Sequence, residues 1–100
     1  MSHVTRESLQ SIKKSGVKMQ LLLFFYNNPF TVDDLEGISM WVGMHKKEIT
    51  REMEELCQMR LLVKRGTSHS YYRMTENSQL VEEVQKLIKE FYAQRKTKAS

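Results

Sequence analysis

Apolar side chains recur at intervals of three and four residues along most of the chain, the spacing that places them on one face of an α-helix. This spacing predicts helices over residues 5–14, 17–27, 45–59 and 79–94. The segment 17–27 is apolar around most of its surface, so we expect it to lie at the centre of the core. Residues 95–100 carry no such stripe and are expected to be disordered.

A shorter helix is expected between Pro29, which cannot continue the preceding helix, and Gly43, a frequent helix stop. Three polar residues are candidates for its N-terminal cap: Thr31, Asp33 and Asp34. Met40 and Trp41 widen the apolar band that this helix is expected to turn towards the core. Gly37 weakens the helix interior, so it is expected where another helix approaches closely.

After residue 60 the apolar spacing changes from helical to alternating. Residues 61–65 and 71–75 are predicted to be strands, joined by a polar turn over residues 66–70. Tyr71 and Tyr72 fall on opposite faces of their strand. We therefore expect one ring to pack inward and the other to lie at the surface.

The order of these elements is that of a winged helix-turn-helix. The predicted fold is mainly α with a small β-hairpin, an extra N-terminal helix and a long C-terminal helix. A chain of 100 residues is expected to form a single domain, residues 1–100. The helix-turn-helix is predicted over residues 31–60 and the wing, which is the β-hairpin, over residues 61–75.

Three stretches of sequence carry a resemblance to a known group of proteins. They are residues 37–43 (GISMWVG), residues 49–63 with MEEL at 53–56 and LLV at 61–63, and residues 71–75 (YYRMT). These stretches resemble the second helix, the third helix with the first wing strand, and the second wing strand of bacterial and archaeal winged-helix repressors. The arsenical-resistance and multiple-antibiotic-resistance types are among them. The resemblance implies a dimeric DNA-binding protein whose third helix enters the major groove.

The chain departs from these families in three ways. Arg60 stands where they usually place glycine, asparagine or lysine. The third helix is acidic for a DNA-reading helix, with Glu48, Glu52, Glu54 and Glu55. The paired cysteines of some metal-sensing repressors are missing, because Cys57 is the single cysteine. Cys57 is therefore interpreted as a small buried apolar residue.

A formal net charge of +4 permits a polyanionic partner. The resemblance assigns base and phosphate contacts to the start of the third helix and phosphate contacts to the wing. The predicted DNA-binding residues are His45, Lys46, Lys47, Thr50, Arg51, Lys64, Arg65 and Arg73. The alternative is a solvated helix face, with pairs such as Glu48 and Arg51 at helical spacing, beside ordinary surface charge on an exposed hairpin.

The last helix carries a broad apolar stripe that one small domain need not bury alone. The predicted dimer-interface residues are Leu9, Ile12, Leu80, Val84, Leu87 and Phe91. The alternative is that this stripe packs against the helix over residues 17–27 of the same chain.

No catalytic arrangement of serine, histidine and acid, no phosphate-binding glycine loop and no metal motif occurs in the sequence. We therefore expect no enzymatic activity, no metal and no cofactor. A single cysteine and the lack of a membrane-length apolar run favour a cytoplasmic protein. Two other functions remain open: an adaptor that binds protein instead of DNA, and a sensor with an apolar effector in a dimer cleft.

Overall fold

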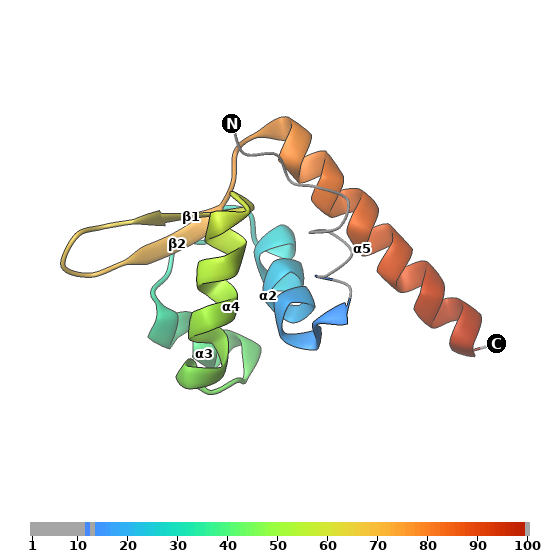
Figure 1. The fold of residues 1–100 in the computed structure, drawn as a ribbon, viewed down its shortest axis with the longest axis horizontal. Helices are drawn as coiled ribbons and strands as arrows, with labels where there is room; N and C mark the ends of the chain where they lie inside the picture. Colours follow the sequence, from blue (N-terminus) through green and yellow to red (C-terminus); the bar gives the residue numbers. More distant parts are fainter. Residues whose placement is uncertain (1–11, 13, 100) are drawn as a thin grey trace.

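The computed structural model describes residues 12 and 14–99, with side chains as far as residue 93. Most of the N-terminal helix predicted over residues 5–14, including Leu9, lies outside the described residues, whereas Ile12 and Lys14 are helical. The later elements follow the predicted order of helices and hairpin. Figure 1 shows the hairpin projecting from one side of the helical body and the last helix from the other.

The centre of the fold is α2 (Gly16–Asn27), which contacts the other three numbered helices and the second strand. The helix begins after Ser15, whose hydroxyl accepts a hydrogen bond from the Lys18 N–H at 3.2 Å. Its buried residues are Met19, Leu21, Leu22 and Phe25. The predicted central position of this segment is confirmed.

The helix-turn-helix consists of α3 (Leu35–Val42) and α4 (Lys46–Gln58). Asp34 is the residue that caps α3, because its Oδ1 accepts a hydrogen bond from the Gly37 N–H at 2.8 Å. Gly43 ends α3 in the left-handed conformation, with φ of 70°. Glycine adopts this conformation without a steric penalty, which allows the sharp turn into α4.

Two expectations for α3 are wrong. The group that lies against Gly37 is the carboxylate of Asp33, not another helix, and a Cβ at this position would collide with it. The apolar band is also narrower than expected, since Met40 is 79% exposed and Trp41 is 72% exposed. Ile38 is the buried residue of α3, and Met40, two positions further on, lies on the opposite face. Trp41, three positions from Ile38, lies beside the buried face and stacks on Phe24, yet most of its ring is exposed.

The wing is the antiparallel hairpin of β1 (Leu62–Arg65) and β2 (Tyr71–Met74). Tyr72 is buried, and its backbone exchanges two hydrogen bonds with Asp33 on the far side of β2. The outer edge of β1 is therefore the free edge of the hairpin. Tyr71 is exposed, so the prediction that the two tyrosines face opposite ways is confirmed.

The last helix, α5 (Ser78–Ala99), is longer than the predicted 79–94. It is capped by Asn77, whose Oδ1 accepts a hydrogen bond from the Leu80 N–H at 3.1 Å. The prediction of a disordered tail is wrong as far as Ala99, because residues 94–99 contain no glycine or proline and are mostly good helix formers. Figure 1 shows α5 passing α2 and extending beyond the rest of the fold. Within the described part of the chain, no helix is long and apolar enough to cross a membrane.

Candidate nucleic-acid interface

The recognition-helix candidate α4 has one buried face and one polar face, as its spacing predicts. Ile49, Met53 and Leu56 are fully buried. These side chains belong to the helix that packs against α2, α3 and β1. Because the buried face is fixed from three sides, the polar face is held outward in one orientation.

The N-terminal part of α4 brings together five of the predicted DNA-binding residues. All five are exposed, and we call them the basic turn: His45, Lys46, Lys47, Thr50 and Arg51. Nδ1 of His45 accepts a hydrogen bond from the Lys47 N–H at 3.3 Å, which caps the helix. Among the described residues Lys46 and Lys47 make no ion pair, and Arg51 is 86% exposed at 3.8 Å from Glu55. The basic turn therefore keeps its positive charge towards solvent.

The acids in the C-terminal half of α4 have cationic partners from other elements. Nζ of Lys18 on α2 lies 2.8 Å from Oε1 of Glu52 and 2.7 Å from Oε1 of Glu55. Burial lowers the pKa of Lys18, whose side chain is only 13% exposed, but the hydrogen bonds and charges of both glutamates outweigh this effect and raise it. The hydrogen bond from Lys18 also lowers the pKa of Glu55. Lys18 therefore stabilises the charged form of Glu55 and is also paired with Glu52.

Glu54 is paired with the wing. Nζ of Lys64 lies 2.9 Å from Oε1 of Glu54 and 5.9 Å from the centroid of the Tyr72 ring. The hydrogen bond to Glu54 raises the pKa of Lys64. Lys64, which is predicted to contact phosphate, lies against α4 in the structure and is paired there with Glu54.

The cations predicted on the wing are divided between its two faces. The strand register pairs Arg65 with Tyr71 and Val63 with Arg73. Arg65 and Arg73 therefore share one face of the hairpin, and Lys64 lies on the other. Arg73 forms an ion pair with Glu76. Within the described part of the chain, Arg65 is the wing cation that makes no ion pair.

His69 belongs to this surface although nothing in the sequence singles it out. Its Nε2 lies 2.7 Å from Oδ2 of Asp34, which joins the tip of the wing to the cap of α3. Its ring packs edge-on against Tyr71, with centroids 5.0 Å apart. Hydrogen bonds from the Gly37 N–H and then from His69 lower the pKa of Asp34. Lys18 is missed in the same way, because its partners are remote in sequence.

A hollow of about 300 Å³ separates the basic turn from the wing. Lys46 lines it from α4, while Lys64 and His69 line it from the wing. Asp34 and Glu36 line it from the start of α3. These acids interrupt the positive surface between the two predicted contact regions.

The predicted dimer-interface residues separate into two groups. Ile12, Val84 and Leu87 are buried within the single chain, which is the alternative expected from packing against α2. Leu80 and Phe91 are half-buried and pack on the edge of the same core. Leu9 lies outside the described residues.

The described residues offer little for thiol or metal chemistry. Burial, with a smaller contribution from the charge of Glu54, raises the pKa of Cys57 to about 11, so its thiol is neutral at physiological pH. Over the described ranges, no group of three or more histidine, cysteine, aspartate or glutamate side chains is placed to hold a metal ion.

No protein family model matches the chain, and no curated protein matches it. Its fold is similar to that of the AntR antimony-specific transcriptional repressor, at 13% identity over 100% of this chain and 91% of that chain, with a TM-score of 0.67. A possible transcriptional regulator from Methanosarcina mazei Go1 is 13% identical over 93% of this chain and 84% of its own, with a TM-score of 0.61. A protein from the thermoacidophilic archaeon Sulfolobus tokodaii is 16% identical over 92% of this chain and 98% of its own, also with a TM-score of 0.61. The predicted fold, a mainly helical winged helix-turn-helix with a two-stranded wing, is confirmed.

Proposed function

We propose that this chain is a dimeric, non-enzymatic transcriptional regulator that binds double-stranded DNA through the basic turn of α4. The observation that carries the proposal is the distribution of charge along α4. Glu52, Glu54 and Glu55 are paired with Lys18 or Lys64, whereas Lys46 and Lys47 make no ion pair within the described ranges. The acidic residues in the C-terminal half of the helix are therefore compensated within the fold.

The position of the basic turn suits a duplex. In helix-turn-helix proteins, residues at the start of the second helix contact base edges, and the helix N-terminus itself favours phosphate. Arg51 is exposed and has the donors for a bidentate bond to guanine, while Lys46 and Lys47 suit phosphate. Arg65 is proposed as the principal phosphate contact of the wing, since Lys64 and Arg73 are already paired.

The names of two structural neighbours support a regulatory role, because one is a transcriptional repressor and the other a possible transcriptional regulator. The antimony specificity in the first name is not part of this proposal. For the dimer, we propose contacts along the outward side of α5, with Phe91 and the exposed Tyr92. Dimeric helix-turn-helix proteins place their recognition helices on successive major grooves, about 34 Å apart, and we propose the same arrangement for the two basic turns.

The test is binding to a random-sequence duplex of about 30 base pairs, roughly three helical turns, across a salt series. Affinity that falls steeply with salt, followed by selection of a preferred site, is the expected result. On that site, Arg51→Ala is expected to weaken binding by about 1–3 kcal/mol. Lys89→Ala removes an exposed cation of α5 and is expected to leave affinity unchanged. Failure to bind at low salt, or equal effects of the two variants, contradicts the assignment.

A second function, binding of a protein partner, is favoured by one specific observation. Apolar side chains are exposed on α3 and on the loop before it: Phe30 at 93%, Met40 at 79% and Trp41 at 72%. Trp41 is stacked on Phe24, with ring centroids 6.3 Å apart, so its ring is presented in a defined position. Absence of DNA binding, together with loss of a partner protein in Trp41→Ser, supports this alternative.

A further inference from the structure

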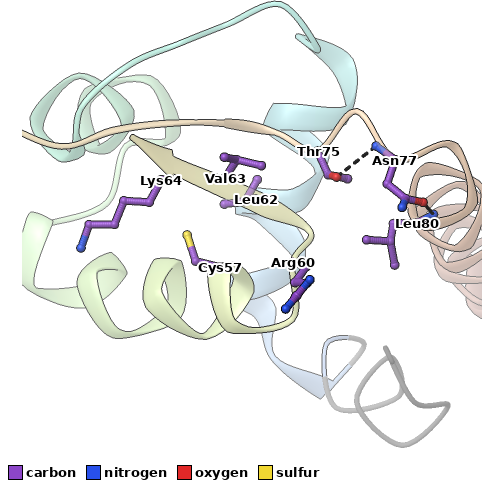
Figure 2. Close-up of a pocket in the computed structure, with 8 residues that line it drawn as sticks. All are labelled: Cys57, Arg60, Leu62, Val63, Lys64, Thr75, Asn77 and Leu80. Carbon is purple, nitrogen blue, oxygen red and sulfur yellow. Dashed lines mark hydrogen bonds between the residues drawn. The ribbon is translucent and has the colours of Figure 1, made fainter. Parts of the chain in front are cut away.

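A second hollow lies behind the wing, where α4 ends and β1 and α5 begin. Its volume is about 440 Å³, within the range of small-molecule sites. Its lining residues are Cys57, Arg60, Leu62, Val63, Lys64, Thr75, Asn77 and Leu80. Figure 2 shows Arg60 between Cys57 on one side and Leu80 on the other, with Thr75 and Asn77 near the start of α5.

The apolar part of this lining is aliphatic. Leu62 and Val63 come from β1 and Leu80 from α5, and the neutral thiol of Cys57 adds to the same wall. No aromatic ring lines the hollow, so a flat ligand finds no stacking partner there. An aliphatic chain matches these walls better than an aromatic ring does.

The polar part of the lining consists mainly of donors. Asn77 uses its side-chain oxygen to cap α5, and its N–H donates to Oγ1 of Thr75 at 3.1 Å (dashed in Figure 2). The Nδ2 of Asn77 makes no hydrogen bond to the described residues. Lys64 is occupied by Glu54. Arg60 is the other cation that lines the hollow, and it forms no ion pair with the residues that the structure describes.

The backbone of Arg60 gives an independent reason to consider it functional. Its φ of 65° is the sole positive φ of a non-glycine residue among those described. Its N–H donates to the Cys57 carbonyl, and the Leu61 N–H donates to the Leu56 carbonyl, which is the hydrogen-bond pattern of a Schellman motif. Glycine is the favoured residue at this position because it has no Cβ. An arginine kept there against its backbone preference points to a role for its side chain.

We propose that this hollow binds a small aliphatic carboxylate, held by the guanidinium of Arg60 and the side-chain amide of Asn77. The planar fork of an arginine matches the two oxygens of a carboxylate. The aliphatic chain of the ligand lies against Val63 and Leu80. This site is within one chain and takes an anion, which distinguishes it from an apolar cleft between two subunits.

The site touches the end of α4, the base of the wing and the start of α5. A ligand held there contacts three elements whose relative positions determine where the basic turn and the wing lie. Control of DNA binding by the ligand rests on the proposed function. Occupation of the site does not, and it can be measured without DNA.

The experiment is a titration of the full chain with hexanoate, followed by amide chemical shifts in two-dimensional NMR spectra. Hexanamide, which has the same aliphatic chain without the charge, is the matched probe. Hexanoate is expected to cause saturable shifts at Leu62, Val63, Asn77 and Leu80 at millimolar concentration. Hexanamide is expected to bind at least tenfold more weakly, because the charge-assisted bond to Arg60 is lost.

The test variant is Arg60→Gly. Glycine suits the left-handed backbone, so this variant is expected to melt at the same temperature as the parent or higher. It is also expected to lose at least tenfold in hexanoate affinity. Lys89→Ala removes an exposed cation outside the hollow and is expected to bind hexanoate as the parent does. No saturable shift, equal binding of the two probes, or full binding by Arg60→Gly each overturns the proposal.

Discussion

The N-terminal half of α4 is mainly basic and the C-terminal half is acidic, and the two halves differ in how much of their charge is paired within the fold. In the N-terminal half, Lys46, Lys47 and Arg51 are exposed, and among the described residues only Arg51 of these three has an ion-pair partner, Glu55 at 3.8 Å. In the C-terminal half, Glu52 and Glu55 are held by Lys18 at 2.8 and 2.7 Å. The charge of the basic half is therefore available to a ligand, whereas the charge of the acidic half is paired within the fold.

This difference shows why the net charge of a helix is a poor guide to what the helix binds. The sequence of α4 contains more acidic than basic residues, which argues against a DNA-reading helix. Once the pairs with Lys18 and Lys64 are considered, Glu48 is the acid of α4 that lacks an ion pair among the described residues. The charge that a ligand meets is therefore the basic turn plus Glu48.

The largest effect is expected from Lys18→Met, which leaves Glu52 and Glu55 without the lysine that pairs with them. The lysine is only 13% exposed, so two partly buried carboxylates are left to repel each other. We expect a loss of about 1–2 kcal/mol in the free energy of unfolding, because a hydrogen bond to a charged group is removed while both acids remain. Urea denaturation at neutral pH measures this loss.

Lys46→Met is the matched control for this prediction, because it removes a lysine of the basic turn that has no ion pair with the described residues. Its stability is expected to change by less than about 0.5 kcal/mol, while its DNA affinity falls. If both variants lose the same stability, the two halves of α4 do not differ as proposed.

Much of the fold follows from local pattern. Asp34 caps the start of α3 and Gly43 ends it, as their residue types predict. The alternation of side chains along a strand likewise predicts that Tyr71 and Tyr72 lie on opposite faces. The end of α5 is missed because an apolar stripe marks the packed part of a helix, whereas the helix itself continues to Ala99 through residues of good helix propensity.

The site is less accessible to sequence reasoning, because its geometry depends on contacts between remote residues. Lys18 and Glu52 are 34 positions apart, and His69 and Asp34 are 35 apart. No local spacing predicts either pair. The placement of Lys64 on one face of the hairpin, and of Arg65 and Arg73 on the other, is more predictable. It is determined by strand alternation together with the hairpin register.

A smaller effect is expected from Glu48→Gln, which removes the acid of α4 that has no ion pair among the described residues. Loss of its repulsion of phosphate is expected to strengthen DNA binding by about 0.5–1 kcal/mol at low salt, and less at high salt. The same change is expected to destabilise the helix by about 0.3–1 kcal/mol, because Glu48 lies in the first turn of α4 and favours its dipole. Fluorescence anisotropy with a labelled duplex measures the gain.

Glu55→Gln is the matched change in the other half of α4. Its carboxylate is already compensated by Lys18, so neutralising it is expected to alter DNA affinity by less than Glu48→Gln does. An equal or larger gain from Glu55→Gln indicates that intramolecular pairing does not hide the acids of this half from DNA.

The smallest effect concerns Asp34, an acid beside the basic turn that is itself held by the fold. The Gly37 N–H and His69 lower its pKa, so its carboxylate stabilises the folded state above its unfolded pKa, and this contribution is lost as pH falls through the lower folded value. Between about pH 6 and about pH 3, a window that spans the ordinary aspartate pKa, the parent is therefore expected to lose more stability than Asp34→Asn. Asparagine keeps the cap but does not titrate.

Glu36→Gln, a neutralised neighbour on α3, is expected to follow the parent in urea denaturation at each pH. Parallel curves for the parent and Asp34→Asn mean that the bonds from Gly37 and His69 do not stabilise the charged form of Asp34, and that the wing is not anchored there by charge.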